Sequence, residues 1–291
     1  MRVYITGCGG MLGEAFYHRL KNSDNFFATD IDVNDTFLEY GDVRDSDLTT
    51  RQIHTFEPDI VVHLAALTDV EYCELHPKEA HVTNMLGTQN VLNACKALDV
   101  PMVHISTAGV FDGDQDAYME EDTPNPINAY GKTKYAAEQL VAQYTKHYIF
   151  RAGWMMGGGE KKDKKFVNKL LKKIKNGEKE LFVVDDKFGT PTYTYDLVQN
   201  IFNVVEKESY GLYHSVCEGC ASRYDVAEYI LKELQRDDIV LHKVSSDFVA
   251  KEYHAPRPVS EKLVNKRLME QNLYTMRSWQ ECLKEYLTQW N

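Results

Sequence analysis

The sequence lacks any apolar stretch long enough to cross a bilayer, and nothing at its start has the composition of a leader. A membrane-spanning helix needs about 20 predominantly apolar residues in a row. The short segment from Arg2 to Ile5 runs directly into a glycine-rich turn, which leaves no room for the apolar core of a signal peptide. We therefore expect a cytoplasmic protein with no membrane partner.

Cysteine is also scarce. The 291 residues include 6 cysteines, and their spacing does not match a disulfide framework, which fits a reducing compartment. Cys217 and Cys220 form a single C-x-x-C pair with His214 nearby, but a zinc site needs further ligands at suitable spacing. We interpret these cysteines as structural thiols and predict no metal site.

Positive charge is in the minority, with 33 Lys and Arg against 44 Asp and Glu and a net charge of −11. This balance disfavours nonspecific binding to nucleic acid or to anionic membranes. Charged residues make up 26% and hydrophobic residues 43% of the chain, which is typical of a globular protein. The length allows one large domain or two smaller ones.

The chain opens with a β-rich run at Val3–Thr6, followed by glycines at positions 7, 10 and 13 and a helical pattern from about Glu14. In a strand–turn–helix unit, glycines allow a tight turn, close approach of the backbone to a phosphate, and close packing of helix on strand. The start of the helix would face a diphosphate with its free N–H groups. The residues assigned to this contact are Gly7, Gly10, Met11, Leu12 and Gly13.

An acidic residue, Asp30, ends the second predicted strand, twenty residues after Gly10. A carboxylate there accepts hydrogen bonds from the adenosine ribose and repels a 2′-phosphate, which favours NADH over NADPH. Asp42 follows the next apolar stretch and is either an adenine contact or a simple turn acid. A buried strand over 59–66 ends in small residues that would let the cofactor lie against it, while His63 within it is interpreted as a core histidine. The further cofactor-binding candidates are Asp42, Val43, Ala65 and Ala66.

Tyr130 and Lys134 are four residues apart in a helix-forming run, so they share one helix face. Tyrosine ionises near pH 10, and a neighbouring positive charge is expected to lower its pKa. The pair is therefore a candidate proton donor or acceptor. An ordinary exposed Tyr and Lys would produce the same short pattern.

Strands and helices alternate over the first 150 residues or so, which predicts a doubly wound parallel sheet of the Rossmann α/β type. Thr107 ends the predicted strand over 100–107, at the sheet edge where such folds bind ligands. We expect residues 1–151 and about 185–206 to form the dinucleotide-binding domain. Residues 152–184 and 207–291 would form a smaller mixed α/β substrate lobe, with a helix predicted over 261–269.

Six segments in order resemble the extended short-chain dehydrogenase/reductase family and, within it, the dTDP-4-dehydrorhamnose reductases. Their joint occurrence is far more specific than any one of them. They are the glycine turn 7–13, Ser106-Thr107 with Val110 to Gly113, Tyr130 to Lys134, Arg151 to Trp154, Gly189 to Thr192, and Ala255 with Arg257, Pro258 and Ser260.

The resemblance implies roles for the matching residues. Tyr130 would be the general acid, Lys134 would hold the nicotinamide ribose, and Thr107 would bind the reacting oxygen. Trp154 would lie beside the sugar, and the segment around Arg257 would belong to the substrate lobe. The implied reaction is hydride transfer from NADH, or from NADPH, to the 4-keto group of a nucleotide-linked 6-deoxysugar, in deoxysugar and cell-surface polysaccharide biosynthesis.

The sequence departs from the resembling reductases at one turn. They carry Asp-Tyr after the Ser-Thr pair, where this chain has Ala108 and Gly109. The two side chains contact sugar in the family, so their loss bears on the choice of substrate more than on the reaction type. Ala108 is retained as a candidate substrate-binding residue.

Three functions stay open on the sequence alone. The first is a sugar-nucleotide 4-ketoreductase, for which a homodimer is a candidate assembly, and the second is an epimerase or dehydratase that retains its NAD through each cycle. The third is a non-catalytic nucleotide-binding regulatory subunit, which an intact Thr107, Tyr130 and Lys134 argue against. Steady consumption of NADH with a 4-keto sugar nucleotide would separate the first from the others.

Overall fold

The chain folds around one parallel sheet, seen in a computed structural model that describes residues 1–23 and 25–290. Every neighbouring pair of its strands is parallel. In these residues the sheet has seven strands, in the spatial order β11 (Gly211–His214), β6 (His147–Ala152), β5 (Met102–Thr107), β4 (Ile60–His63), β1 (Val3–Thr6), β2 (Phe26–Asp30) and β3 (Leu38–Tyr40). The predicted doubly wound Rossmann fold is confirmed.

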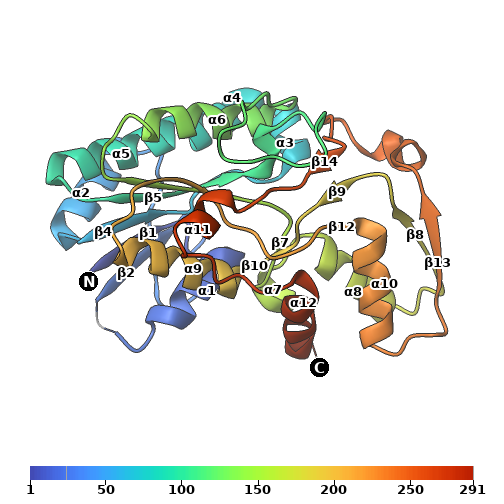
Figure 1. Ribbon diagram of the computed structural model, residues 1–291. Coiled ribbons are helices and arrows are strands. Elements are labelled where there is room, and N and C mark those ends of the chain that lie inside the picture. Colours follow the sequence, from blue (N-terminus) through green and yellow to red (C-terminus); the bar gives the residue numbers. More distant parts are fainter. Residues whose placement is uncertain (24, 291) are drawn as a thin grey trace.

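Two layers of helices cover the sheet (Figure 1). One face carries α2 (Ser46–Phe56), α4 (Pro77–His81), α5 (Gly87–Leu98) and α6 (Ala129–Val141), and the other carries α1 (Met11–Leu20) and α9 (Thr194–Glu206). Side chains alternate along each strand, so Val3 and Ile5 of β1 pack toward α1 while Tyr4 packs toward α2. The sheet is therefore buried on both sides, as its apolar strands require.

After β6, α9 and β11 belong to the large sheet and its helical layers, whereas most of the other elements lie to the side of that sheet (Figure 1). Three small sheets form there, from β7 (Met155–Met156) with β10 (Thr192–Tyr193), from β9 (Phe188–Gly189) with β12 (Ala221–Ser222) and β14 (Ser260–Glu261), and from β8 (Glu180–Val184) with β13 (Val240–Val244). The helices among them are α7 (Gly159–Lys162), α8 (Phe166–Lys175), α10 (Arg223–Glu233) and α12 (Trp279–Leu287), whereas α11 (Lys266–Glu270) packs on β11 of the large sheet (Figure 1).

Two predicted boundaries are wrong. Strand β11 completes the large sheet beside β6, whereas the sequence pattern assigns residues 207–214 to the substrate lobe. The predicted helix over 261–269 is replaced by β14 and the short helix α11, because Ser260 and Glu261 pair with β9. Strand pairing over long range is decided by tertiary packing, which local propensity does not report.

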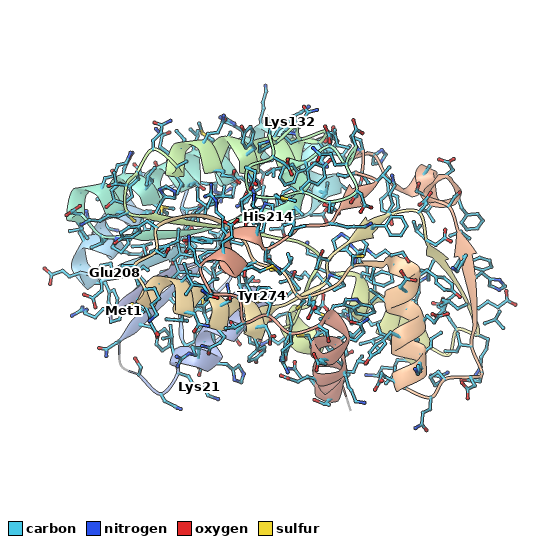
Figure 2. The ribbon with its side chains drawn as sticks, viewed as in Figure 1. Met1, Lys21, Lys132, Glu208, His214 and Tyr274 are labelled. Carbon is cyan, nitrogen blue, oxygen red and sulfur yellow. The ribbon has the colours of Figure 1, made fainter. Side chains whose placement is uncertain are left out.

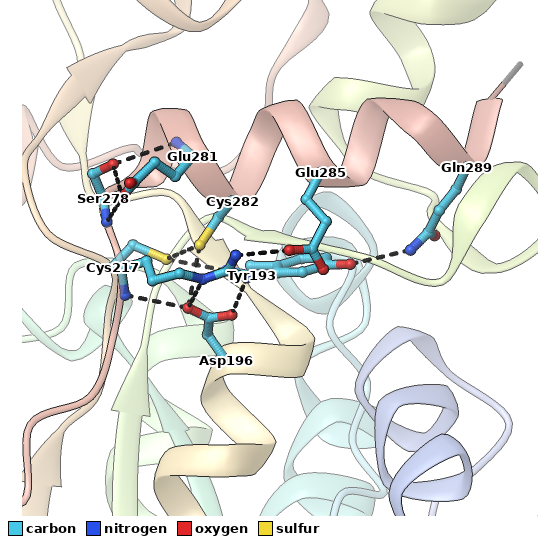
Figure 3. Close-up of polar contacts among 9 residues, drawn as sticks. Tyr193, Asp196, Cys217, Ser278, Glu281, Cys282, Glu285 and Gln289 are labelled. Carbon is cyan, nitrogen blue, oxygen red and sulfur yellow. Dashed lines mark hydrogen bonds and ion pairs between the residues drawn. The ribbon is translucent and has the colours of Figure 1, made fainter.

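The final helix is tied to α9 by a polar cluster (Figure 3). Asp196 accepts hydrogen bonds from Arg277 at 2.6 and 3.0 Å, and Arg277 also donates to Glu285 at 2.7 Å. Cys217 faces Cys282 at 3.6 Å between their sulfur atoms, so its partner is on α12 rather than at Cys220. All six cysteines are free thiols. Across residues 1–23 and 25–290, none of the helices is long and apolar enough to cross a membrane.

Candidate active site

Helix α6 begins at the carboxyl end of β5 and is held there by two side-chain oxygen acceptors. The Asn128 side chain accepts a hydrogen bond from the Gly131 N–H at 2.8 Å, and Glu74 accepts one from the Ala129 N–H at 2.7 Å. A Cβ on Gly131 would stand 2.2 Å from the Gly109 carbonyl oxygen. Glycine at 131 therefore lets the first turn of α6 pack directly on the turn that follows β5.

This packing places Tyr130 beside Thr107. Tyr130 is half-buried, and burial raises the pKa of its phenol to about 12, while interaction with the Thr107 side chain acts in the opposite direction. The expected lowering of the pKa by Lys134 is wrong for this structure, because desolvation of the phenolate dominates and Lys134 is not among the groups that shift this pKa. Tyr130 therefore keeps its proton at neutral pH, which is the state a general acid requires.

Lys134 lies one turn further along α6 and is 4% exposed. Burial lowers the pKa of its ammonium to about 8, and the Glu138 carboxylate acts in the opposite direction. Glu138 is already engaged, since it pairs with Arg151 and accepts a hydrogen bond from Ser106 at 2.7 Å. Lys132, between the two candidates in the sequence, points away from the molecule (Figure 2).

Several polar side chains beneath this pair are hydrogen-bonded to one another. His63 bonds to Thr6 at 2.7 Å and to Thr88 at 2.9 Å, which confirms its interpretation as a core histidine. Asn84 lies in η1 (Val82–Leu86), a π-helical turn that the sequence did not predict. Its side chain accepts a hydrogen bond from the Leu67 N–H at 2.7 Å and donates one to Thr133 at 3.1 Å. Asn84 thereby ties the segment after β4 to α6, and such single π turns are frequent at functional sites.

The glycine turn fits a diphosphate. Gly7 has φ +68°, and a Cβ there would stand 2.4 Å from the Ala65 Cα, so the turn lies against the end of β4. A Cβ on Gly13 would stand 2.1 Å from the Cys8 carbonyl oxygen, so glycine at 13 lets the first turn of α1 pack directly on the turn that follows β1. Gly10 has open space beside it, its nearest neighbour being 3.9 Å away. Helix α1 begins at Met11, three residues earlier than predicted, so its free N–H groups border that space.

The ribose candidate lies at the rim of the same turn. One oxygen of Asp30 accepts a hydrogen bond from the Gly9 N–H at 2.8 Å, and the other accepts one from the Asp32 N–H at 3.0 Å.

The other cofactor-binding candidates lie nearby in the sequence. Asp42 is hydrogen-bonded by Arg44, which lowers the pKa of the Asp42 carboxyl. Val43 is 6% exposed and packs against Gly87 in the core. Ala65 and Ala66 follow β4 and are partly buried. Asp30 is thus well placed for a ribose, whereas the adenine contact of Asp42 stays a prediction.

A glycine-rich loop crosses the start of α1. Gly158, at φ +77°, lies against Met11, with 3.1 Å between the position of its missing Cβ and the Met11 Cα. The lysines that follow contact the protein itself, since Lys162 pairs with Asp35 at 2.7 Å and Lys165 donates to the Thr68 carbonyl at 3.0 Å. The loop therefore covers the amino end of α1 while its charges are paired nearby.

The remaining substrate-binding candidates, Trp154, Arg257 and Ala108, have different surroundings. Trp154 adopts φ +38°, an uncommon conformation for a residue with a side chain, and its Nε1 donates a hydrogen bond to Glu261 at 2.8 Å. Arg257 is paired with Glu71 of α3 (Val70–Leu75) at 2.6 Å. Ala108 is fully buried in a small core with Phe111 and packs against Gly153, so its side chain offers no surface to a sugar. The structure thus brings Thr107, Tyr130 and Lys134 together, whereas the side chain of Ala108 is buried in the core.

A parallel doubly wound sheet, a glycine turn at the first strand and a Tyr–Lys pair beside a strand-end threonine define an extended short-chain dehydrogenase/reductase. Within that class, the chain belongs to the family described as RmlD substrate binding domain, which it matches over residues 1–291.

Similar proteins of known name span nearly the whole chain. It is 33% identical to dTDP-4-dehydrorhamnose reductase of Mycolicibacterium smegmatis, covering 98% of this chain and 84% of the relative. It is 31% identical to spore coat polysaccharide biosynthesis protein SpsK of Bacillus subtilis, covering 98% and 96%. A crystal structure of dTDP-4-dehydrorhamnose reductase from Bacillus anthracis in complex with NADP superposes with a TM-score of 0.89 at 30% identity, covering 99% and 98%. The resemblance found in the sequence is confirmed.

Proposed function

We propose that the protein uses NAD(P)H to reduce the 4-keto group of a nucleotide-linked 6-deoxysugar, as a step of deoxysugar biosynthesis. The observation that carries the proposal is the half-buried phenol of Tyr130, which keeps its proton beside Thr107 at the end of β5. The names of the similar proteins, dTDP-4-dehydrorhamnose reductases, supply the substrate class. The substrate of this chain is therefore a nucleotide-sugar.

Different groups of the protein position the substrate, donate the proton and hold the cofactor. Thr107 donates a hydrogen bond to the reacting carbonyl oxygen, which positions it next to Tyr130. Tyr130 gives its proton to that oxygen as negative charge develops there. Lys134 holds the nicotinamide ribose with its ammonium group, and the N–H groups at the start of α1 hold the diphosphate. NAD(P)H, when bound, supplies the hydride.

Asp30 sets the cofactor preference in this proposal. Its carboxylate accepts a hydrogen bond from the Gly9 N–H, at the rim of the diphosphate turn. In that position it can accept a hydrogen bond from a ribose hydroxyl, whereas its negative charge repels a 2′-phosphate. The preferred cofactor is therefore NADH, with NADPH as the weaker alternative. The NADP complex of the Bacillus anthracis relative is compatible with such a preference, because repulsion by one partly exposed carboxylate weakens binding without abolishing it.

The remaining assignments belong to the same proposal. Residues 152–184 and the part of the chain after β11 form the substrate lobe over the carboxyl end of the large sheet. The six free thiols support a reducing, cytoplasmic location. The homodimer stays a prediction, which sedimentation velocity would decide.

The test is the steady consumption of NADH or NADPH with dTDP-linked 4-keto-6-deoxysugars. A reductase oxidises one cofactor per sugar for as long as both are present. An epimerase or dehydratase that regenerates its bound NAD consumes none, and a regulatory subunit does not turn over. Absence of sustained consumption over a panel of dTDP, UDP and GDP sugars would refute the proposed function.

A further inference from the structure

The turn after β5 would accept a side chain the size of a methyl group at Gly109. Gly109 lies beside Thr107, and a Cβ built on it would make only ordinary contacts, 3.4 Å to the Thr107 Oγ1 and 3.6 Å to Glu261 Oε1. The backbone at Gly109 does not have a positive φ, so glycine is not required there by conformation. Besides Thr107, the position of that Cβ is approached by a carboxylate from a distant segment.

That carboxylate, Glu261, has one oxygen engaged and one directed at the turn. Oε2 accepts the hydrogen bond from Trp154 Nε1 at 2.8 Å, whereas Oε1 is the oxygen nearest to Gly109. Strand β14, which carries Glu261, pairs in parallel with β9, so the position of the carboxylate is set by backbone hydrogen bonding. The charge of Glu261 also reaches Tyr130, whose pKa it helps to raise.

Trp154 and Arg223 hold the carboxylate in place. The indole ring lies on Gly189, where a Cβ would stand 2.3 Å from Cε2, so the absence of a side chain at 189 makes room for it. The guanidinium of Arg223 stacks on the indole, 3.6 Å from the ring centroid, and its charge attracts that of Glu261. An acceptor fixed in this way retains its geometry when a ligand arrives.

We propose that Glu261 is a specificity-determining residue, whose free oxygen Oε1 binds a hydroxyl on the sugar carbon next to the ketone, in the place that Ala108 and Gly109 leave without a polar side chain. The inference rests on the proposed function. It narrows the proposed substrate class to 4-keto sugars that carry a hydrogen-bond donor on the carbon next to the reacting one. Trp154 acts in this arrangement as a positioning residue for the carboxylate.

The expected size of the effect follows from the charge of the acceptor. A hydrogen bond to a charged group contributes about 1.5 to 3 kcal/mol, which corresponds to roughly a tenfold to a hundredfold preference. Most of this preference should appear in KM, since the hydroxyl is bound in the ground state as well as in the transition state.

The experiment compares kcat/KM for a 3-hydroxy 4-keto sugar nucleotide with that for its 3-deoxy analogue, in the parent protein and in Glu261→Gln. Glutamine still offers an oxygen to Trp154 but replaces the charged acceptor at the turn with a neutral amide. The parent should prefer the hydroxylated sugar by roughly tenfold to a hundredfold, and Glu261→Gln should lose most of that preference, chiefly through a higher KM for the hydroxylated sugar. Glu228→Gln, an exposed position on α10, is the control and should leave both rates unchanged.

The outcomes separate the two proposals. If the parent turns over neither sugar, the proposed function fails and the role of Glu261 fails with it. If the parent is active but Glu261→Gln lowers both rates by the same factor, Glu261 only supports the structure and the specificity assignment is overturned. The assignment is likewise overturned if the variant matches the parent on both sugars.

Discussion

Replacing Lys134 with methionine should make the protein more stable and less active at once. The substitution removes an ammonium group that is 4% exposed and fills the same space with an apolar chain of similar length. The ammonium is retained for the cofactor ribose, according to the proposed mechanism, and it is costly to keep charged in the folded protein. Methionine removes both the contact with the cofactor ribose and the free-energy cost of burying a charged ammonium.

The size of the cost follows from the lowered pKa. Burial lowers the pKa of Lys134 from 10.5 to about 8. Each tenfold loss of proton affinity corresponds to about 1.4 kcal/mol, so the charged form costs the folded state up to about 3 kcal/mol. The unfolded chain binds more protons between the two pKa values, so this cost is fully present below about pH 8 and has vanished above about pH 10.5.

The assay is equilibrium urea unfolding of the cofactor-free protein, followed by far-UV circular dichroism between about pH 6 and about pH 10. At neutral pH, Lys134→Met should exceed the parent in free energy of unfolding by up to about 3 kcal/mol, and the difference should shrink as the pH rises above about 8. Lys132→Met, exposed on the same helix, should match the parent throughout. A variant that is no more stable than the parent at neutral pH, or a difference that does not change up to about pH 10, would show that the buried ammonium carries no such cost.

Three further substitutions test the site. Tyr130→Phe removes the proton donor but keeps the ring, so turnover should fall by about a hundredfold or more with cofactor affinity unchanged by fluorescence titration; near-parental turnover would exclude Tyr130 as the acid. Asp30→Ala should weaken NADH and improve NADPH in kcat/KM, and a parent that already prefers NADPH would contradict the assigned role. Gly131→Ala places a Cβ 2.2 Å from the Gly109 carbonyl oxygen, so it should destabilise the protein by about 1 to 3 kcal/mol and lower kcat by displacing Tyr130. Parental stability and kcat would mean that α6 can shift without harm.

The sequence predicted the parts of the fold that local pattern controls. Apolar runs at Val3–Thr6 and over 59–66 became β1 and β4, and the glycine turn lies between β1 and α1 as expected. These elements follow from periodicity and turn chemistry within a few residues. Tyr130 and Lys134 share a face of α6 for the same reason, since their spacing fixes it.

Features that depend on distant segments could not be predicted. The local pattern predicts a helix at Glu261, because nothing in 260–269 signals that β9 pairs with it across about seventy residues of chain. The contact of Glu261 with Trp154, and the stacking of Arg223 on that ring, require the tertiary structure. The pKa of Tyr130 is expected from the sequence to fall, because the sequence shows a neighbouring charge but not the burial that raises this pKa.

Delivery of a hydride from NAD(P)H to carbon 4 of a nucleotide-linked 6-deoxysugar is the step on which the proposed function depends. The most direct measurement uses cofactor labelled with deuterium at the transferable position of the nicotinamide, with the sugar product examined by NMR. The proposed mechanism predicts deuterium at carbon 4 of the product, in a ratio of one label per cofactor oxidised, and a loss of this label transfer in Tyr130→Phe. A product that forms without deuterium from the added cofactor would contradict it, because the hydride would then have remained within the enzyme or the sugar.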